Sequence, residues 1–254
     1  GYFGMPHILL RFMAIEDEKK LKLSRRVATI WVVISLFVAV FIGVIGYTMS
    51  KVGALEMLTG SNSETIIVKI SALLSQHGVI FALLAGVILA GILASTMSTS
   101  DSQLLAASSA VSSDILGAFR KDSSNKNGSM AAARITLLVI SVVAAFIARN
   151  PDSSVFAIVS FAWAGFGAAF GPVVLFSLFW KRTNKWGALA GMVCGGSMVF
   201  IWKYLIRPLG GIWNIYELLP AFLIACAAIV IVSLLTPKPS KEIEEEFDRV
   251  AQMK

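Results

Sequence analysis

The chain consists mainly of long, uninterrupted apolar runs separated by short polar segments. A run of about 18 or more apolar residues can cross the roughly 30 Å hydrocarbon core of a bilayer as a helix. The runs do not alternate between apolar and polar positions, so they predict helices rather than the strands of a barrel. The sequence therefore predicts an all-α, polytopic membrane helix bundle with spans at residues 27–50, 78–105, 131–148, 155–180, 186–205 and 218–236.

The segments between the spans add local predictions. Residues 65–76 have an amphipathic pattern, which predicts a short helix lying on the outer membrane face. Residues 150–152 (NPD) predict a tight turn that joins the third and fourth spans into a hairpin. The Ser-, Asn- and Gly-rich residues 122–129 predict a mobile inner loop. The tail, residues 237–254, is charged and helical in pattern, and we expect it in the cytoplasm.

Lysine and arginine residues are distributed unequally between the two sides of this arrangement. With the N-terminal segment inside the cell, 17 of the 22 lie in the inner segments; the other five are Lys51, Lys69, Arg149, Lys203 and Arg207. Such an excess of basic residues is typical of cytoplasmic loops. The bias predicts a multi-pass protein of the plasma (inner) membrane, with both ends of this chain cytoplasmic. Because the basic residues are spread over several loops, the net charge of +7 does not indicate a nucleic-acid partner.

Composition narrows the classes of function further. The chain is 57% hydrophobic and 15% charged, whereas soluble domains carry about 25% charged residues. The sequence has no glycine-rich phosphate loop, no paired carboxylates and no His/Cys set with metal-ligand spacing, so we do not expect an enzyme. Cys194 and Cys226 lie inside apolar runs, which indicates packing residues. Residue 1 is Gly and the first run starts only at Val27, so we expect a further part of the protein upstream.

The second predicted span ends in a polar stretch, residues 93–103, at a depth where polar groups are costly. Four hydroxyl residues in it are spaced i, i+3, i+4, i+7 and so share one helical face: Ser95, Ser98, Thr99 and Ser102. Neutral oxygens of this kind suit a small hard cation that must be released in every cycle. Hydroxyls on membrane helices also bond their own backbone or join helices, so helix packing remains an alternative. Asp101 is either a functional carboxylate or a group at the inner water interface.

Small residues mark the fourth predicted span. Gly165, Gly167 and Gly171 predict a face for close helix packing, and Pro172 interrupts the backbone hydrogen bonds. A gate or hinge at Gly171 and Pro172 is the alternative.

Residues 94–99 (ASTMST), followed by residues 102–105 (SQLL), resemble the signature helix of the sodium:solute symporter family. Two further stretches are similar to the proline-transporting members of that family: residues 1–14 (GYFGMPHILLRFMA) and 160–172 (SFAWAGFGAAFGP). The similarity extends from residue 1 to about residue 235, with matching helix order. The family resemblance therefore covers nearly the whole chain.

The resemblance implies a fold of two inverted five-helix repeats with additional peripheral helices, of which this chain holds a part. It also implies that the hydroxyls of Ser98 and Thr99 and the backbone carbonyl of Ser95 bind the coupling ion, Na⁺. The remaining ligands are expected from a broken first core helix outside this chain. The family usually has Ala at the position of Ser95. Some members have a second sodium site, which corresponds here to Asp101 and Ser102.

The activity implied by the resemblance is sodium-coupled secondary active transport, a symport of L-proline across the plasma membrane. Sodium would bias one state of two rocking helix bundles and so couple solute entry to the sodium gradient. The expected partners are the solute, the lipid bilayer and the upstream half of the same transporter. The alternatives are a symporter for another small organic solute and a transporter-like sensor domain joined to a signalling module. A channel is disfavoured because only one span is polar over consecutive turns.

Overall fold

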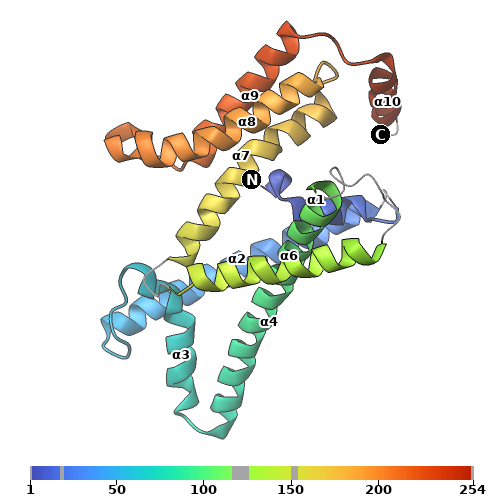
Figure 1. Ribbon diagram of the computed structural model, residues 1–254. Coiled ribbons are helices and arrows are strands. Elements are labelled where there is room, and N and C mark those ends of the chain that lie inside the picture. The colour runs from blue at the N-terminus through green and yellow to red at the C-terminus, as the bar shows by residue number, and fades with distance from the viewer. Residues whose placement is uncertain (1, 18–19, 116–125, 150–153, 253–254) are drawn as a thin grey trace. The chain divides into compact units, whose positions relative to one another are not determined.

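The computed structural model describes residues 2–17, 20–115, 126–149 and 154–252 (Figure 1). The regular elements in these residues are all helical. Six helical segments are long and apolar enough to cross a membrane: Lys20–Lys51, Val79–Ile115, Met130–Ile147, Val155–Phe179, Lys185–Leu209 and Leu218–Leu235. The prediction of an all-α polytopic chain with six spans is therefore confirmed.

Three of the predicted spans end or begin inside longer helices. Helix α2 (Lys20–Lys51) begins seven residues before the predicted start at 27, and α4 (Val79–Ser109) continues past 105 into a π-helical turn, η3 (Ala110–Ile115). Lys, Arg, Leu and Ala are good helix formers, so a helix continues beyond the apolar run that marks a span. The predicted loop was also partly wrong, because residues 126–129 form the first turn of α6 (Lys126–Ile147). Residues 122–125 and the turn at 150–152 lie outside the described residues.

The chain divides into two compact units. Unit 1 comprises Gly1–Ala14 and Phe156–Lys254, and unit 2 comprises Ile15–Val155. Unit 2 holds α2, α4, η3 and α6 together with a 3-10 turn, η2 (Gly60–Thr65), and α3 (Ile66–Ser75). Unit 1 holds a 3-10 turn, η1 (Tyr2–Gly4), and the helices α1 (Pro6–Met13), α7 (Val155–Phe179), α8 (Lys185–Ile201), α9 (Leu218–Leu235) and α10 (Lys241–Gln252). The short turns η4 (Trp202–Ile206), η5 (Arg207–Leu209) and η6 (Gly211–Trp213) join α8 to α9.

Within unit 2, α3 and α4 form the hairpin that is visible in Figure 1. The chain reverses at Gly78, whose φ of 115° is accessible to glycine but costly for other residues. Helix α3 packs on α2 at Gly46, where a Cβ atom would lie only 2.3 Å from Cγ1 of Ile66. Helices α4 and α6 are joined by the Ser108 hydroxyl, which donates to the Ala133 carbonyl at 2.8 Å. The predicted short helix over 65–76 is confirmed as α3, and its place on the outer membrane face remains a prediction.

Glu64, in the segment before α3, bonds to the last residues of unit 2, where α7 begins. The carboxylate of Glu64 accepts a hydrogen bond from the backbone N–H of Val155 at 3.0 Å and another from the Ser154 hydroxyl. A carboxylate at a helix N-terminus satisfies a free backbone donor and interacts favourably with the helix dipole. Glu64 therefore caps α7 although it lies 91 residues away in the sequence.

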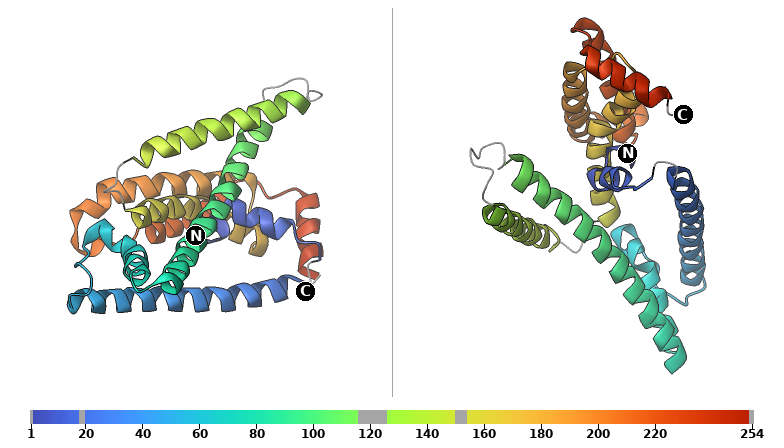
Figure 2. Two further views of the ribbon diagram at one scale, coloured as in Figure 1. Left: turned by 90° about the horizontal axis from the view of Figure 1, so that it is seen from below. Right: turned by 90° about the vertical axis from the view of Figure 1, so that its right-hand side faces the viewer.

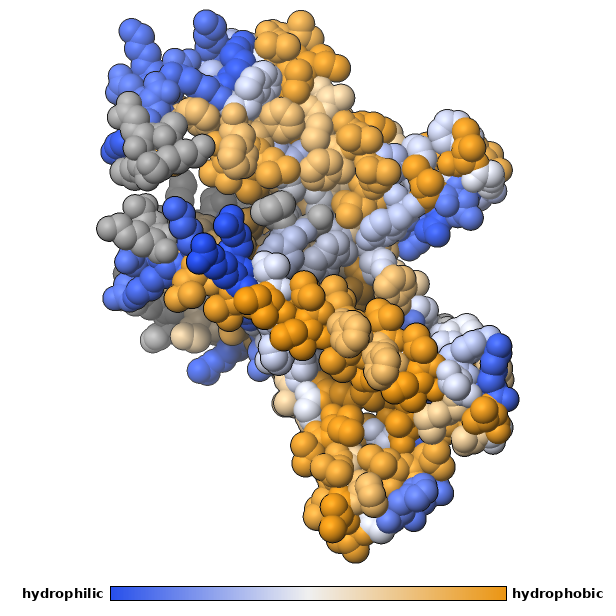
Figure 3. All heavy atoms as spheres, turned by 180° about the vertical axis from the view of Figure 1, so that it is seen from behind, coloured by the Kyte–Doolittle hydropathy of each residue, from blue (hydrophilic) through white to orange (hydrophobic). Residues whose placement is uncertain are grey.

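Helices α7, α8 and α9 of unit 1 pack closely because small residues meet at their contacts. Gly187, Gly191 and Gly195 are buried along one face of α8. A Cβ atom on Gly191 would lie 2.4 Å from Ile229 of α9, and one on Gly195 would lie 2.2 Å from the Ala168 carbonyl oxygen of α7. Small residues let membrane helices approach one another closely. Large apolar side chains elsewhere remain exposed in this chain, and they cover much of the face drawn in Figure 3.

Asn184 connects the two ends of the α8–α9 hairpin. Its side-chain oxygen caps α8 by accepting from the Gly187 N–H at 2.9 Å. Its amide nitrogen donates to the Thr236 hydroxyl at 2.7 Å and to the Pro237 carbonyl at 2.8 Å. The start of α8 is therefore level with the end of α9, as antiparallel spans require.

Candidate functional site

The three atoms proposed to bind sodium lie together on α4. The Ser98 hydroxyl is 2.9 Å from the backbone carbonyl oxygen of Ser95, and the Thr99 hydroxyl is 3.2 Å from the same oxygen. The helix produces this arrangement by itself, because residues three and four positions after Ser95 lie over its carbonyl. All three residues are exposed in this chain.

The spacing of these oxygens suits a small hard cation. Ca²⁺, an ion close to Na⁺ in size, holds oxygen ligands at about 2.3–2.6 Å, so two neighbouring ligands lie about 3–3.5 Å apart. The two distances to the Ser95 carbonyl are close to that separation. Both hydroxyls now donate to this carbonyl, and a hydroxyl hydrogen rotates readily, which would turn the lone pairs toward an ion. The same hydrogen bonds also satisfy the hydroxyls without an ion, as the packing alternative requires.

A second row of hydroxyls lies on another face of α4. Thr96 donates to the Ile92 carbonyl at 2.8 Å, and Ser100 donates to the Thr96 carbonyl at 3.0 Å. With the hydroxyls of Ser98 and Thr99, this row makes α4 polar around much of its circumference at this level. Such a helix is costly to surround with lipid. It is therefore suited to the interior of a larger helix assembly or to a water-filled cavity.

The residues expected for a second sodium site, Asp101 and Ser102, follow the first cluster along α4. The Ser102 hydroxyl donates to the Ser98 carbonyl at 3.0 Å, one turn beyond the first cluster. Asp101 is exposed, and adjacent residues on a helix point in different directions.

Gly171 and Pro172 are packed inside unit 1. Both residues are buried, and α7 continues through them as one helix. A Cβ atom on Gly171 would lie 3.2 Å from the ring of Phe222 in α9. Pro172 has no N–H that could donate to the carbonyl of Ala168, four residues earlier. The same carbonyl faces Gly195 in the row of buried glycines of α8 (Gly187, Gly191 and Gly195), the glycine stripe. The contacts match the close-packing interpretation, whereas no observation tests a hinge.

One member of the predicted small-residue face is placed elsewhere. A Cβ atom on Gly165 would meet nothing within 4 Å, so Gly165 is not part of the packed face. The buried positions of α7 are instead Ala164, Gly167, Ala168, Gly171 and Pro172. Their spacing of three and four residues follows the helix period, which the spacing from Gly165 to Gly167 does not.

The structure also shows polar residues that the sequence did not reveal. At the end of unit 1 opposite Asn184, the carboxylate of Glu217 is almost fully buried and pairs with the guanidinium of Arg207 at 3.1 Å. The Tyr216 hydroxyl donates to the Ser160 carbonyl at 2.6 Å. Burial raises the pKa of Tyr216, and the nearby Glu217 carboxylate raises it further, so the phenol stays a neutral donor. These contacts fix the connection between α8 and α9 against α7.

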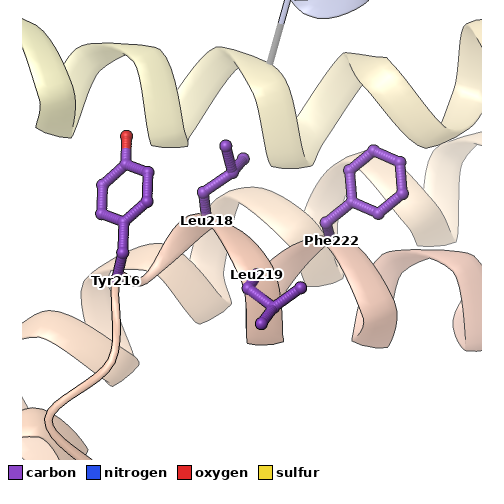
Figure 4. Close-up of a pocket in the computed structure, with 4 residues that line it drawn as sticks. All are labelled: Tyr216, Leu218, Leu219 and Phe222. Carbon is purple, nitrogen blue, oxygen red and sulfur yellow. The ribbon is translucent and has the colours of Figure 1, made fainter.

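A shallow groove lies beside Tyr216 and contains little polar surface. Figure 4 shows Tyr216, Leu218 and Phe222 pointing toward α7, while Leu219 points away. An amino-acid solute carries a carboxylate and an amine, and the groove offers only one phenol to orient them. The groove is therefore no candidate for the solute site.

Comparison with known proteins assigns the chain to a family. Residues 1–195 match the model of the sodium:solute symporter family. The chain is 40% identical over 248 residues to the sodium/proline symporter of Salmonella typhimurium, covering 97% of this chain and 47% of that protein. It is 40% identical over 251 residues to the sodium/proline symporter of Haemophilus influenzae, covering 98% of this chain and 49% of that protein.

A third relative, the osmoregulated proline transporter of Bacillus subtilis, is 39% identical over 241 residues, covering 95% of this chain and 47% of that protein. The chain thus spans about half the length of the curated relatives it matches, and all three are named as transporters rather than enzymes. No solved structure matches the chain. The family model covers most of the chain, including the hydroxyl cluster of α4, and the chain belongs to the sodium:solute symporter family.

Proposed function

We propose that the whole protein performs sodium-coupled symport of L-proline across the plasma membrane, and that this chain supplies its C-terminal part. The observation that carries the proposal is the cluster formed by the Ser95 carbonyl and the hydroxyls of Ser98 and Thr99. The cluster lies within the residues that match a family whose name specifies sodium as the coupling ion. Proline is supported by the names of the relatives.

The chemistry of the cluster supports a transport role rather than permanent ion binding. Its three oxygens carry no formal charge, so they would hold Na⁺ weakly enough for release on the low-sodium side. A hydroxyl that exchanges its hydrogen bond to the Ser95 carbonyl for an ion contact loses little when the ion leaves. The upstream half would supply the remaining ligands and most of the solute site, as part of one transporter domain that includes the whole of residues 1–254.

The proposal also includes the orientation of the chain in the membrane, a second sodium site and a gate or hinge. Both ends of this chain would face the cytoplasm, because 17 of the 22 basic residues then lie in the inner segments. Asp101 and Ser102 are the candidates for a second sodium site, and Gly171 with Pro172 is the candidate gate or hinge.

Uptake of labelled L-proline by the full-length protein tests the proposal. In cells or vesicles without another proline transporter, uptake should require an inward sodium gradient and should stop when that gradient is collapsed. An excess of unlabelled proline should compete with the label better than other small amino acids do. Sodium-dependent uptake of another solute in preference to proline would favour the first alternative. Solute binding without uptake would favour the sensor.

A further inference from the structure

The C-terminal helix α10 is amphipathic, and its apolar residues are not enclosed by the described part of the chain. Ile243, Phe247 and Val250 are spaced i, i+4, i+7 and therefore form one stripe. Ile243 is 57% exposed and Val250 is 55% exposed, while Phe247 is half-buried. The rest of the helix is strongly polar, with five acidic residues against two basic ones. A helix with this division of faces needs an apolar surface to cover its stripe.

The position of α10 within unit 1 limits which surface this can be. Helix α9 ends at Leu235, and only the five residues from Thr236 to Ser240 separate it from α10. Figures 1 and 2 show α10 lying crosswise beyond the ends at which α7 and α9 stop. Three consecutive spans place the ends of α7 and α9 on the same side of the membrane. A helix that crosses these ends runs along the membrane surface instead of projecting from it.

A second tether holds α10 at that level. The amine of Lys181, two residues after the end of α7, pairs with the carboxylate of Asp248 at 2.6 Å. Hydrogen bonding to Asp248 raises the pKa of Lys181, so the amine keeps its charge at neutral pH. Glu244, one turn before Asp248, adds attraction from the same side of α10. The helix is thus fixed both at its start and near its end.

The charge of α10 separates it from ordinary surface-binding helices. Those helices usually carry Lys and Arg on the polar face, and attraction to anionic lipids strengthens their binding. The acidic excess of α10 would instead be repelled by an anionic leaflet. Its placement must therefore depend on the tethers and on burial of the apolar stripe. The pair with Lys181 removes part of the acidic charge from the side that faces the protein.

We propose that α10 is an interfacial helix, held crosswise under α7 and α9 by the pair between Lys181 and Asp248, with Ile243, Phe247 and Val250 inserted between lipid headgroups. The partner of this surface is the lipid bilayer. The short tether keeps the local concentration of the stripe at the interface high, so weak apolar contacts suffice without electrostatic attraction.

Site-directed fluorescence in the full-length protein, reconstituted in lipid nanodiscs, tests this proposal. A small fluorophore is attached to single cysteines that replace Val250 on the stripe or, as the matched control, Glu245 on the opposite face. These variants are made in a background without Cys194 and Cys226 or any other cysteine. Quenching is measured with aqueous iodide and with lipids carrying a nitroxide near the headgroup. Iodide should quench position 250 about fivefold less than position 245, and the nitroxide lipid should show the reverse order.

Charge variants test the tether. Lys181→Glu should make position 250 more accessible to iodide, by about threefold, and adding Asp248→Lys to it should restore the protection. Equal iodide quenching at positions 250 and 245 would overturn the interfacial placement. Protection of position 250 from both quenchers would also overturn it, because the stripe would then lie against protein, either the upstream half or a second copy. Lipid contact that is unchanged in Lys181→Glu would refute the role of the ion pair.

Discussion

The assignment of a cation site to α4 predicts opposite effects for two substitutions of Thr99 in the full-length protein. Thr99→Val keeps the shape of the side chain and removes its oxygen, whereas Thr99→Ser keeps the oxygen and removes a methyl group. If the hydroxyl binds sodium, the valine variant should be severely affected and the serine variant mildly. If the hydroxyl only packs, the order reverses, because valine preserves volume and serine leaves a small void.

The structure indicates why the loss should appear in sodium affinity. Without an ion, the Thr99 hydroxyl donates to the Ser95 carbonyl at 3.2 Å, and that carbonyl has a second hydroxyl donor, Ser98, at 2.9 Å. Removing the Thr99 hydroxyl therefore costs little in the ion-free state. In the ion-bound state one ligand is missing, which should cost on the order of 1–3 kcal/mol. This corresponds to a sodium requirement raised roughly fivefold to 150-fold.

Uptake of labelled proline, titrated with sodium at matched expression, measures this effect. The sodium concentration for half-maximal uptake should rise in Thr99→Val, while uptake at saturating sodium should fall less. Ser98→Ala should behave in the same way, since its hydroxyl lies closer to the shared carbonyl. An unchanged sodium dependence in Thr99→Val would refute the assignment for that residue.

Three further predictions concern packing and topology. In a thermal unfolding assay of the purified protein, Gly195→Ala should lower the stability by about 1–3 kcal/mol, because the new methyl group meets a backbone carbonyl of α7. The control Gly196→Ala should be neutral or stabilising, because its methyl group would lie 3.9 Å from the nearest side chain. Asn184→Ala should lower the stability by about 2 kcal/mol, and Asn184→Asp should lower it less, since aspartate keeps the oxygen that caps α8 and loses only the amide donors. Equal losses of stability in the two variants would argue against a separate contribution of the cap. In intact cells, a membrane-impermeant reagent should label a cysteine at Asp152 and not one at Lys254; labelling at Lys254 would refute the proposed topology.

The spans and the hydroxyl cluster were predictable because each depends on local sequence. An apolar run long enough to cross a bilayer has few alternatives to a helix. Once residues 93–103 are helical, the positions of the Ser98 and Thr99 hydroxyls over the Ser95 carbonyl follow from the period of 3.6 residues. The helix ends were less predictable, since α2 and α4 continue into polar sequence that hydropathy assigns to loops.

The contacts between distant residues could not be predicted from the sequence. The glycines of α8 recur every four residues, which signals close packing without naming the partner helix. The pairs between Lys181 and Asp248 and between Glu64 and the start of α7 join residues 67 and 91 positions apart. Nothing local distinguishes these carboxylates from the other acidic residues of the chain.

The glycine stripe of α8 has a consequence for how the protein enters the membrane during synthesis. Each glycine that allows close packing also takes the place of an apolar side chain, and the α8 segment is the least apolar of the six spans, whereas α9 is the most apolar. Helix α8 leaves the ribosome first and, as the least apolar span, has the weakest tendency of the six to remain in lipid alone. Because α8 packs on α9, we expect the two to insert as a pair, so that integration of α8 depends on the sequence that follows it. Variants that weaken α9 should accordingly reduce the yield of membrane-inserted α8 before they affect transport.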